Sequence, residues 1–126
     1  MPTKTKKNIN SKAEIIELDA ENQVLGRLAV QAAKYLQGKH RTDYQPNKSG
    51  ETVVKIKNAK KIEITGKKET DKMYWSHSGY AGGLYGRTYK EVFKKSPQRV
   101  IEYAVSGMLP KNKLRRERMK RLIIEL

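Results

Sequence analysis

Hydrophobic residues follow two different periods along this chain, and these periods predict an alternation of strands and helices. Ile15, Ile16 and Leu18 form a short apolar run, as expected of a buried strand that stops at a turn. The next segment has a helical period, and Gly38 after it can adopt the left-handed conformation that ends a helix. The helix should cover about residues 26–37, with its apolar face formed by Leu25, Leu28, Ala29, Ala32 and Leu36.

The middle of the chain predicts three further strands separated by turns. Two of them are expected at residues 53–56 and 62–64, with a single turn at residues 58–60 between them. A short strand at residues 73–76 should precede a loop, because glycine permits backbone paths that other residues cannot take. The glycines of this expected loop are Gly79, Gly82, Gly83 and Gly86.

Two helices are predicted in the last third of the chain. Residues 88–95 should form the first, and Ser96 followed by Pro97 is typical of the start of the second. The second helix should stop near Gly107, since Pro110 cannot continue it. Its apolar stripe comprises Val100, Ile101, Ala104, Val105 and Met108. The segment that follows is expected as a short helix or an extended tail.

This alternation favours an α/β fold with a mostly parallel sheet, helices on both faces and right-handed crossovers. A chain of 126 residues holds one modest core, and no internal repeat or second domain is visible. We expect residues 1–13 to be a basic flexible leader and residues 14–126 a single domain. The domain should end in a basic segment at residues 111–121.

The charge of the chain points to a polyanionic partner. Lysine and arginine number 28 against 13 acids, a surplus of 28 − 13 = +15, and the sequence pI is about 10.0. Seven of the eleven positions from 111 to 121 are cations, and Glu117 is the only acid there. Self-repulsion of this size destabilises a compact chain unless a polyanion neutralises it. The alternative is that such basic runs are merely solvated.

Several function classes lack their sequence signatures. Without cysteine there are no disulfides or thiolate metal sites, and no apolar stretch reaches the roughly 18 residues of a membrane span. The glycine motifs of nucleotide-binding loops and the serine-nucleophile motif do not occur. We expect no catalytic site, cofactor, metal ion, membrane or small-molecule substrate, and a location inside the cell. A hydrolase or transferase using His77 as general base is the alternative enzyme hypothesis.

RNA binding requires cations on several loops, small residues and some planar side chains, and four segments meet these requirements. The first follows the end of the predicted first helix, and its donors are Lys39, His40 and Arg41. The second is a turn after a predicted strand, with cations at Lys67, Lys68 and Lys72. The alternative for the first segment is a helix cap with solvated charges, and for the second it is a solvated hairpin tip.

The third segment, residues 74–83, interleaves rings, hydroxyls and glycines and continues to a cation. Rings can stack on bases, and glycines let phosphates approach backbone N–H groups. Its candidate contacts are His77, Ser78, Tyr80, Gly82, Gly83 and Arg87. The alternative is a surface loop with Trp75 in the core.

The fourth segment is the basic segment at residues 111–121. Arginine favours forked contacts to phosphate, whereas lysine acts as a point charge. The candidate arginines are Arg115, Arg116, Arg118 and Arg121, and the candidate lysines are Lys111, Lys113 and Lys120.

Seven short motifs in this order resemble the family of the thirteenth protein of the large ribosomal subunit, over residues 15–122. They are Leu25-Gly26-Arg27-Leu28-Ala29, Gly38-Lys39-His40, Asn58-Ala59, Thr65-Gly66-Lys67, His77-Ser78-Gly79-Tyr80 with Gly82-Gly83, Arg99-Val100-Ile101 and Gly107-Met108-Leu109-Pro110-Lys111-Asn112. Two of these motifs add Arg27 and Arg99 to the candidate RNA contacts. The variants with Thr65-Gly66-Lys67 and Lys111-Asn112 resemble bacterial or organellar members.

The resemblance implies a three-layer α/β/α fold and a structural, non-catalytic role in the large ribosomal subunit. Such a protein would bind large-subunit ribosomal RNA, brace RNA helices, take part in early assembly and contact neighbouring ribosomal proteins. The protein would then lie in the ribosome, in the cytoplasm or an organelle. A free regulator that binds messenger RNA or DNA is the alternative that the same charges allow.

Two departures from the family pattern limit what the resemblance implies. Arg115 stands where the family usually has glycine, so a glycine-dependent turn is not expected there. The chain ends at Leu126, whereas bacterial relatives usually continue, and contacts of such a tail are not carried over.

Overall fold

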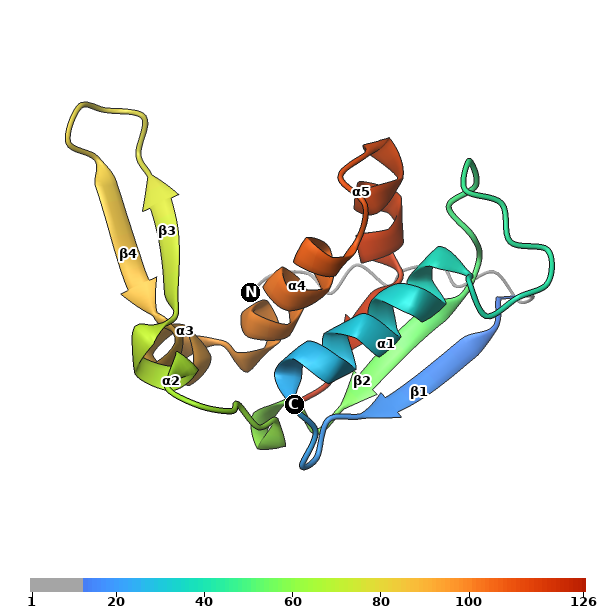
Figure 1. The fold of residues 1–126 in the computed structure, drawn as a ribbon, viewed down its shortest axis with the longest axis horizontal. Coiled ribbons are helices and arrows are strands. Elements are labelled where there is room, and N and C mark those ends of the chain that lie inside the picture. The colour runs from blue at the N-terminus through green and yellow to red at the C-terminus, as the bar shows by residue number, and fades with distance from the viewer. Residues whose placement is uncertain (1–12) are drawn as a thin grey trace, which may run out of the picture.

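The structure is a computed structural model, and it describes residues 13–126. The predicted basic leader lies, except for Ala13, outside the described residues. Figure 1 shows the order of the elements along the chain. They are β1 (Ile15–Asp19), α1 (Leu25–Gln37), β2 (Val53–Lys57), the 3₁₀ turn η1 (Ala59–Lys61), α2 (Lys68–Asp71), β3 (Met73–His77), β4 (Leu84–Thr88), α3 (Tyr89–Lys95), α4 (Pro97–Met108), α5 (Lys113–Lys120) and β5 (Leu122–Ile124).

A parallel sheet of three strands forms the body of the fold, in the order β1-β2-β5. Ile15 pairs with Val53 and Val54 pairs with Leu122, so β2 lies in the centre. The expected α/β class and the parallel sheet are confirmed. Strand β5 was not expected, because its three residues directly follow a charged helix and are too few to show a period.

The core lies between the sheet and the helices α1 and α4. Val54 and Ile56 on one face of β2 belong to the same buried cluster as Leu28 of α1 and Ile101 of α4. The first helix matches its prediction, since Gly38 caps it in the left-handed conformation at φ 78°. At the start of α4, Pro97 takes the first helical position as expected, and the helix runs to Met108.

The opposite face of the sheet carries charged side chains. Lys57 Nζ lies 2.6 Å from Glu17 Oε2, and Lys55 Nζ lies 3.0 Å from Glu125 Oε1. Because alternate residues of a strand share a face, these pairs lie opposite Val54 and Ile56. Over residues 13–126 the helices of the buried cluster therefore cover one face, and the second helical layer of the expected three-layer fold is not found there.

The strand expected at residues 62–64 is wrong. A single bridge joins Val24 to Glu63, and no strand forms around it. The Glu63 N–H donates to Gln23 O at 2.9 Å and its carbonyl accepts from Leu25 N–H at 3.0 Å. The backbone of Glu63 is thus hydrogen-bonded to the turn before α1, while Ile62 is buried in the core.

Strands β3 and β4 form a separate antiparallel hairpin that projects from the body of the fold (Figure 1). Gly86 was expected in a loop but lies in β4, opposite Trp75. A Cβ atom at Gly86 would lie 2.9 Å from Trp75 Cε3, so any larger residue there would displace the ring from this position. Trp75 is 64% exposed, and the alternative that placed it in the core is wrong.

Candidate nucleic-acid interface

Most of the predicted RNA-binding cations lie on the surface. Arg115 is half-buried. The exposed cations come from six places: α1, the loop of residues 38–52, the turn around α2, β4, α4 and the basic segment. The exposed set is Arg27, Lys39, Arg41, Lys67, Lys68, Lys72, Arg87, Arg99, Lys111, Lys113, Arg116 and Lys120. Cations on elements so far apart in the sequence can meet several phosphates at once, because a folded core fixes the spacing between them.

The segment after α1 uses part of its charge within the protein. His40 Nε2 lies 3.1 Å from Glu14 Oε2, and the His40 ring packs edge-on against Tyr35 with 5.1 Å between ring centroids. Arg41 Nε lies 3.1 Å from Asp43 Oδ1. Lys39 is exposed. The predicted RNA contact of His40 fits this geometry poorly, since its Nε2 already faces a carboxylate.

The expected turn forms at Gly66 and Lys67 and leads into a short helix, so this segment is not a hairpin tip. Helix α2 begins at Lys68, after Gly66 in the left-handed conformation. A shallow hollow is lined by Lys67, Lys68 and Lys72 together with Asp71. Three ammonium groups against one carboxylate leave this hollow positive.

The tip of the hairpin is a tight turn held by its own polar groups. Ser78 N–H donates to Gly83 O at 3.1 Å, and Gly83 N–H donates to Tyr80 O at 3.0 Å. A Cβ atom at Gly83 would lie 1.9 Å from Ser78 Oγ, so the turn requires glycine there. His77 Nδ1 accepts from Gly79 N–H at 2.9 Å. The result is that Tyr80 stands 80% exposed at the end of the hairpin.

The basic segment forms α5, and its cations point in opposite directions. Lys113, Arg116 and Lys120 are exposed, whereas Arg118 is only 2% exposed. Asn112 caps the start of the helix, because its Oδ1 accepts from Leu114 N–H at 3.1 Å. Arg115, at the family's usual glycine position, is helical, so no glycine-dependent turn is needed.

Arg118 and Arg121 act inside the protein as an arginine clasp, the name we use for this pair. Arg118 Nη2 donates to Lys48 O at 3.1 Å, and Arg121 Nη1 donates to Thr52 O at 2.7 Å. Arg121 Nη2 also donates to Leu36 O at 2.9 Å and to Ser49 O. The clasp thus fastens the loop of residues 38–52 and the carboxyl end of α1 to α5.

The clasp turns both guanidinium groups toward carbonyl oxygens of the protein, and their contacts with phosphate stay a prediction. Burial lowers the pKa of Arg121, and repulsion by the neighbouring Arg118 lowers it further. Carbonyl oxygens at the end of a helix lack partners within the helix, and they carry partial negative charge. Arg121 supplies the carbonyl of Leu36 with a charged donor, which is a structural role.

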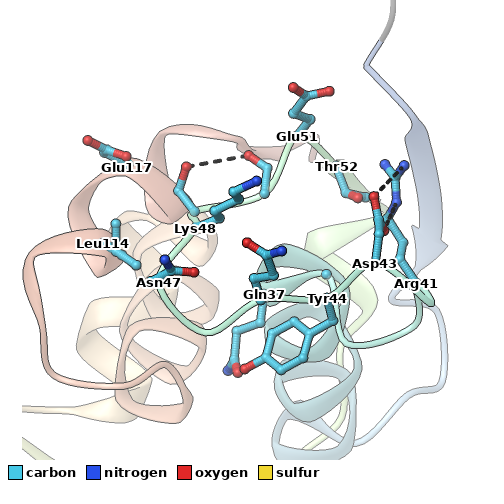
Figure 2. A pocket seen from close by; sticks show the side chains of 14 residues that line it. Gln37, Arg41, Asp43, Tyr44, Asn47, Lys48, Glu51, Thr52, Leu114 and Glu117 are labelled. Carbon is cyan, nitrogen blue, oxygen red and sulfur yellow. Dashed lines mark hydrogen bonds and ion pairs between the residues drawn. The ribbon is translucent and has the colours of Figure 1, made fainter.

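Figure 2 shows a hollow between the loop of residues 38–52 and α5, with Leu114 and Glu117 on the α5 side and Tyr44 on the loop side. Its volume is about 560 Å³. Both signs of charge line it, including Arg41, Asp43 and Glu51. Because the acids compete for any cation nearby, this hollow is poorly suited to a polyanion.

A second hollow, of about 430 Å³, lies between the hairpin and the helices α3 and α4. Arg87 and Arg99 line it as predicted candidates, and Tyr74 belongs to the predicted third segment. Sequence reasoning missed Tyr85, Lys95 and Tyr103. The alternation of side chains along β3 and β4 was the signal that could have grouped these residues on one face. It identifies that face only once the pairing register of the hairpin is known.

Two tyrosines have raised pKa values because their side chains are partly buried by packing. Burial raises the pKa of Tyr89 to about 12 and also raises the pKa of Tyr74. Within residues 13–126 no group of three His, Cys, Asp or Glu side chains could hold a metal ion. In the same range no helix is long and apolar enough to cross a membrane.

Comparison with known proteins identifies the family. Residues 13–124 match the family model described as Ribosomal protein L13. The chain belongs to the ribosomal protein L13 family. This confirms the resemblance inferred from the seven motifs, and the family is one of ribosomal proteins, not of enzymes. The enzyme hypothesis based on His77 is therefore not supported.

Three bacterial relatives show the extent of the match, and each is described as large ribosomal subunit protein uL13. The chain is 44% identical to that of Pseudomonas fluorescens strain Pf0-1 over 122 residues, covering 97% of this chain and 86% of the relative. It is 43% identical to that of Herpetosiphon aurantiacus, covering 97% and 85%. It is 50% identical to that of Trichlorobacter lovleyi over 105 residues, covering 83% and 74%.

Proposed function

We propose that this chain is a structural constituent of the large ribosomal subunit and binds large-subunit ribosomal RNA as a folded electrostatic clamp. Exposed cations from separate elements meet phosphates of different RNA helices, which lowers the cost of packing those helices together. In this role the protein braces the RNA, acts early in subunit assembly and contacts neighbouring ribosomal proteins. It resides in the ribosome, in the cytoplasm of a bacterial cell.

The proposal rests mainly on one observation in this ribosomal family member: some cations are paired within the protein, whereas others are exposed to solvent. The clasp and the ion pairs of the sheet hold some cations within the protein, while the exposed set projects from six parts of the fold. Phosphates offset the self-repulsion that a net charge of +15 imposes on the compact state. Residues 1–13 contribute Lys4, Lys6, Lys7 and Lys12 to this surplus.

The hairpin tip supplies contacts of a second kind. Tyr80 can stack on an exposed base, and the glycine turn at Gly82 and Gly83 lets a sugar or phosphate approach the backbone. Ser78 and His77 offer polar atoms to ribose hydroxyls. Recognition of structured RNA depends mainly on its shape and its 2′-hydroxyls, so discrimination between sequences should be weak.

Filter binding of the full chain to large-subunit ribosomal RNA tests the clamp. If the protein neutralises roughly 6–10 phosphates, its affinity should fall about 10³- to 10⁵-fold between 50 and 200 mM salt. A matched measurement with a chain carrying Glu in place of Arg41, Lys68 and Arg116 should show a shallower slope. An affinity independent of salt would contradict the clamp.

Sedimentation of cell extract separates the ribosomal role from the regulator hypothesis. A structural constituent should travel with large subunits through a gradient, whereas a free regulator of messenger RNA or DNA would stay near the top. Loss of the protein should also reduce mature large subunits relative to precursor particles if it acts in assembly. Normal subunit maturation without it would contradict the assembly role.

A further inference from the structure

The groove between the hairpin and the helices combines flat rings with cations. Its volume is about 430 Å³, and three tyrosines line it together with three basic residues. The tyrosines are Tyr74, Tyr85 and Tyr103, and the basic residues are Arg87, Lys95 and Arg99. No carboxylate lines this groove, in contrast to the larger hollow beside α5.

Strand register and helix period bring these residues together. In the hairpin Tyr74 pairs with Arg87 and Ser76 pairs with Tyr85, so one hairpin face presents both tyrosines and the arginine. On α4, Arg99 and Tyr103 lie four residues apart and therefore share a side of the helix. The Tyr74 and Tyr103 rings stack with 5.3 Å between centroids, which closes the groove on one side.

The free ring surfaces distinguish this groove from a simple basic patch. Tyr85 and Tyr103 are 51% and 53% exposed, although burying an aromatic ring usually stabilises a folded protein. Phosphates of a paired RNA helix could meet the cations, but the bases in that helix are stacked on each other. A nucleotide outside a helix offers a free base face and a phosphate together.

We propose that this groove takes one unpaired nucleotide of RNA. Its base stacks on the ring of Tyr85 and contacts the ring of Tyr103, and its flanking phosphates meet Arg87, Lys95 and Arg99. The inference rests on the proposed function, since it specifies which structural element of the RNA the hairpin recognises. It adds a requirement that the electrostatic clamp alone does not have, because phosphates are common to paired and unpaired RNA.

Two RNA stem-loops test this groove with the full chain. One has a single unpaired adenosine in its stem, and the other is the same stem-loop without it. We expect the wild-type protein to bind the first more tightly, by about 5- to 150-fold, as one base stacks on an aromatic ring. Tyr85→Ala should abolish most of this preference while leaving affinity for the paired stem-loop nearly unchanged.

Matched variants control for effects on folding. Tyr103→Phe retains the ring and should retain the preference, whereas Tyr103→Ala should lose it. Tyr44→Ala removes a tyrosine that lines the other hollow, and it should behave as wild type. Thermal unfolding of each variant checks that the fold persists, and Tyr85 is the more informative site because its exposed ring lies on the hairpin.

The outcomes separate this inference from the proposed function. If neither stem-loop binds in a salt-dependent manner, the proposed function fails. If both bind equally and Tyr85→Ala changes nothing, the clamp survives and the groove inference is overturned. A polyglutamate peptide tests a protein partner: peptide binding that Tyr85→Ala abolishes, with stem-loop binding unchanged, would assign the groove to an acidic peptide and also overturn the inference.

Discussion

The inner and outer faces of α5 use the same residue type for opposite purposes. Arg116 is exposed, whereas Arg118, two residues later, is buried and donates to the backbone of the loop of residues 38–52. Arg121 just beyond the helix makes three carbonyl contacts, to Leu36, Ser49 and Thr52. The number of cations in a basic run is therefore not the number of phosphates it can bind, because the helical period divides the run between solvent and core.

The largest effect should come from removing the inner charge. Arg121→Met leaves three carbonyls without their donor, and we expect it to lower the free energy of unfolding by about 2–4 kcal/mol. The matched outer change, Arg116→Met, should alter it by less than about 0.5 kcal/mol. Urea unfolding measures both, and equal losses would erase the distinction between the faces of α5.

Substitutions on the outer face of α5 should change RNA affinity and leave the free energy of unfolding nearly unchanged. The double substitution of Arg116→Ala and Lys120→Ala removes two candidate phosphate contacts. The slope of log affinity against log salt should then become shallower by about 0.7–0.9 per lost phosphate. Filter binding to large-subunit ribosomal RNA gives the slope, and an unchanged slope would show that these exposed cations face no phosphate.

The smallest effect contrasts two ways in which this fold holds a cation. Carbonyls hold Arg121, whereas a carboxylate holds Lys57, and the hydrogen bond from Lys57 lowers the pKa of Glu17 below its ordinary value of 4.5. The stabilisation from Glu17 is therefore complete above about pH 4.5 and is lost as pH falls through the lowered pKa. Glu17→Gln should slightly flatten the acid side of the stability profile.

Acid unfolding of the wild type, Glu17→Gln and Arg121→Met provides the measurement. Arg121→Met should lower stability throughout this pH range, since its carbonyl partners do not titrate. A pH profile of Glu17→Gln identical to that of the wild type would mean that the exposed pair contributes nothing.

The sequence predicted those parts of the fold whose residues carry a local pattern. Helix α1 has a continuous apolar stripe and Gly38 at its end, and both determined its bounds. The segment at Ile62 and Ile64 has the alternation of a strand, but its hydrogen bonds go to the turn before α1. The local period of hydrophobic residues does not determine which segment a strand will pair with. The strand prediction therefore failed there, and β5 was not anticipated.

The candidate site also has parts that the sequence could predict and parts that it could not. Net charge and family motifs indicated a nucleic-acid surface, and most of its cations are exposed. The clasp could not be predicted, because Arg118 differs from Arg116 only in the direction that the helix gives it. Tyr85 and Tyr103 were missed because they come from a strand and a helix, which only tertiary structure brings together.

The position of β5 has a consequence for when this protein can fold. Leu122 pairs with Val54 in the central strand, so the sheet lacks an outer strand until residues 122–124 have been synthesised. Until then β2 presents an unpaired backbone edge, which is a hazard for aggregation in a nascent chain. Completion of the native fold is therefore expected after translation of these residues, not progressively as each element emerges from the exit tunnel.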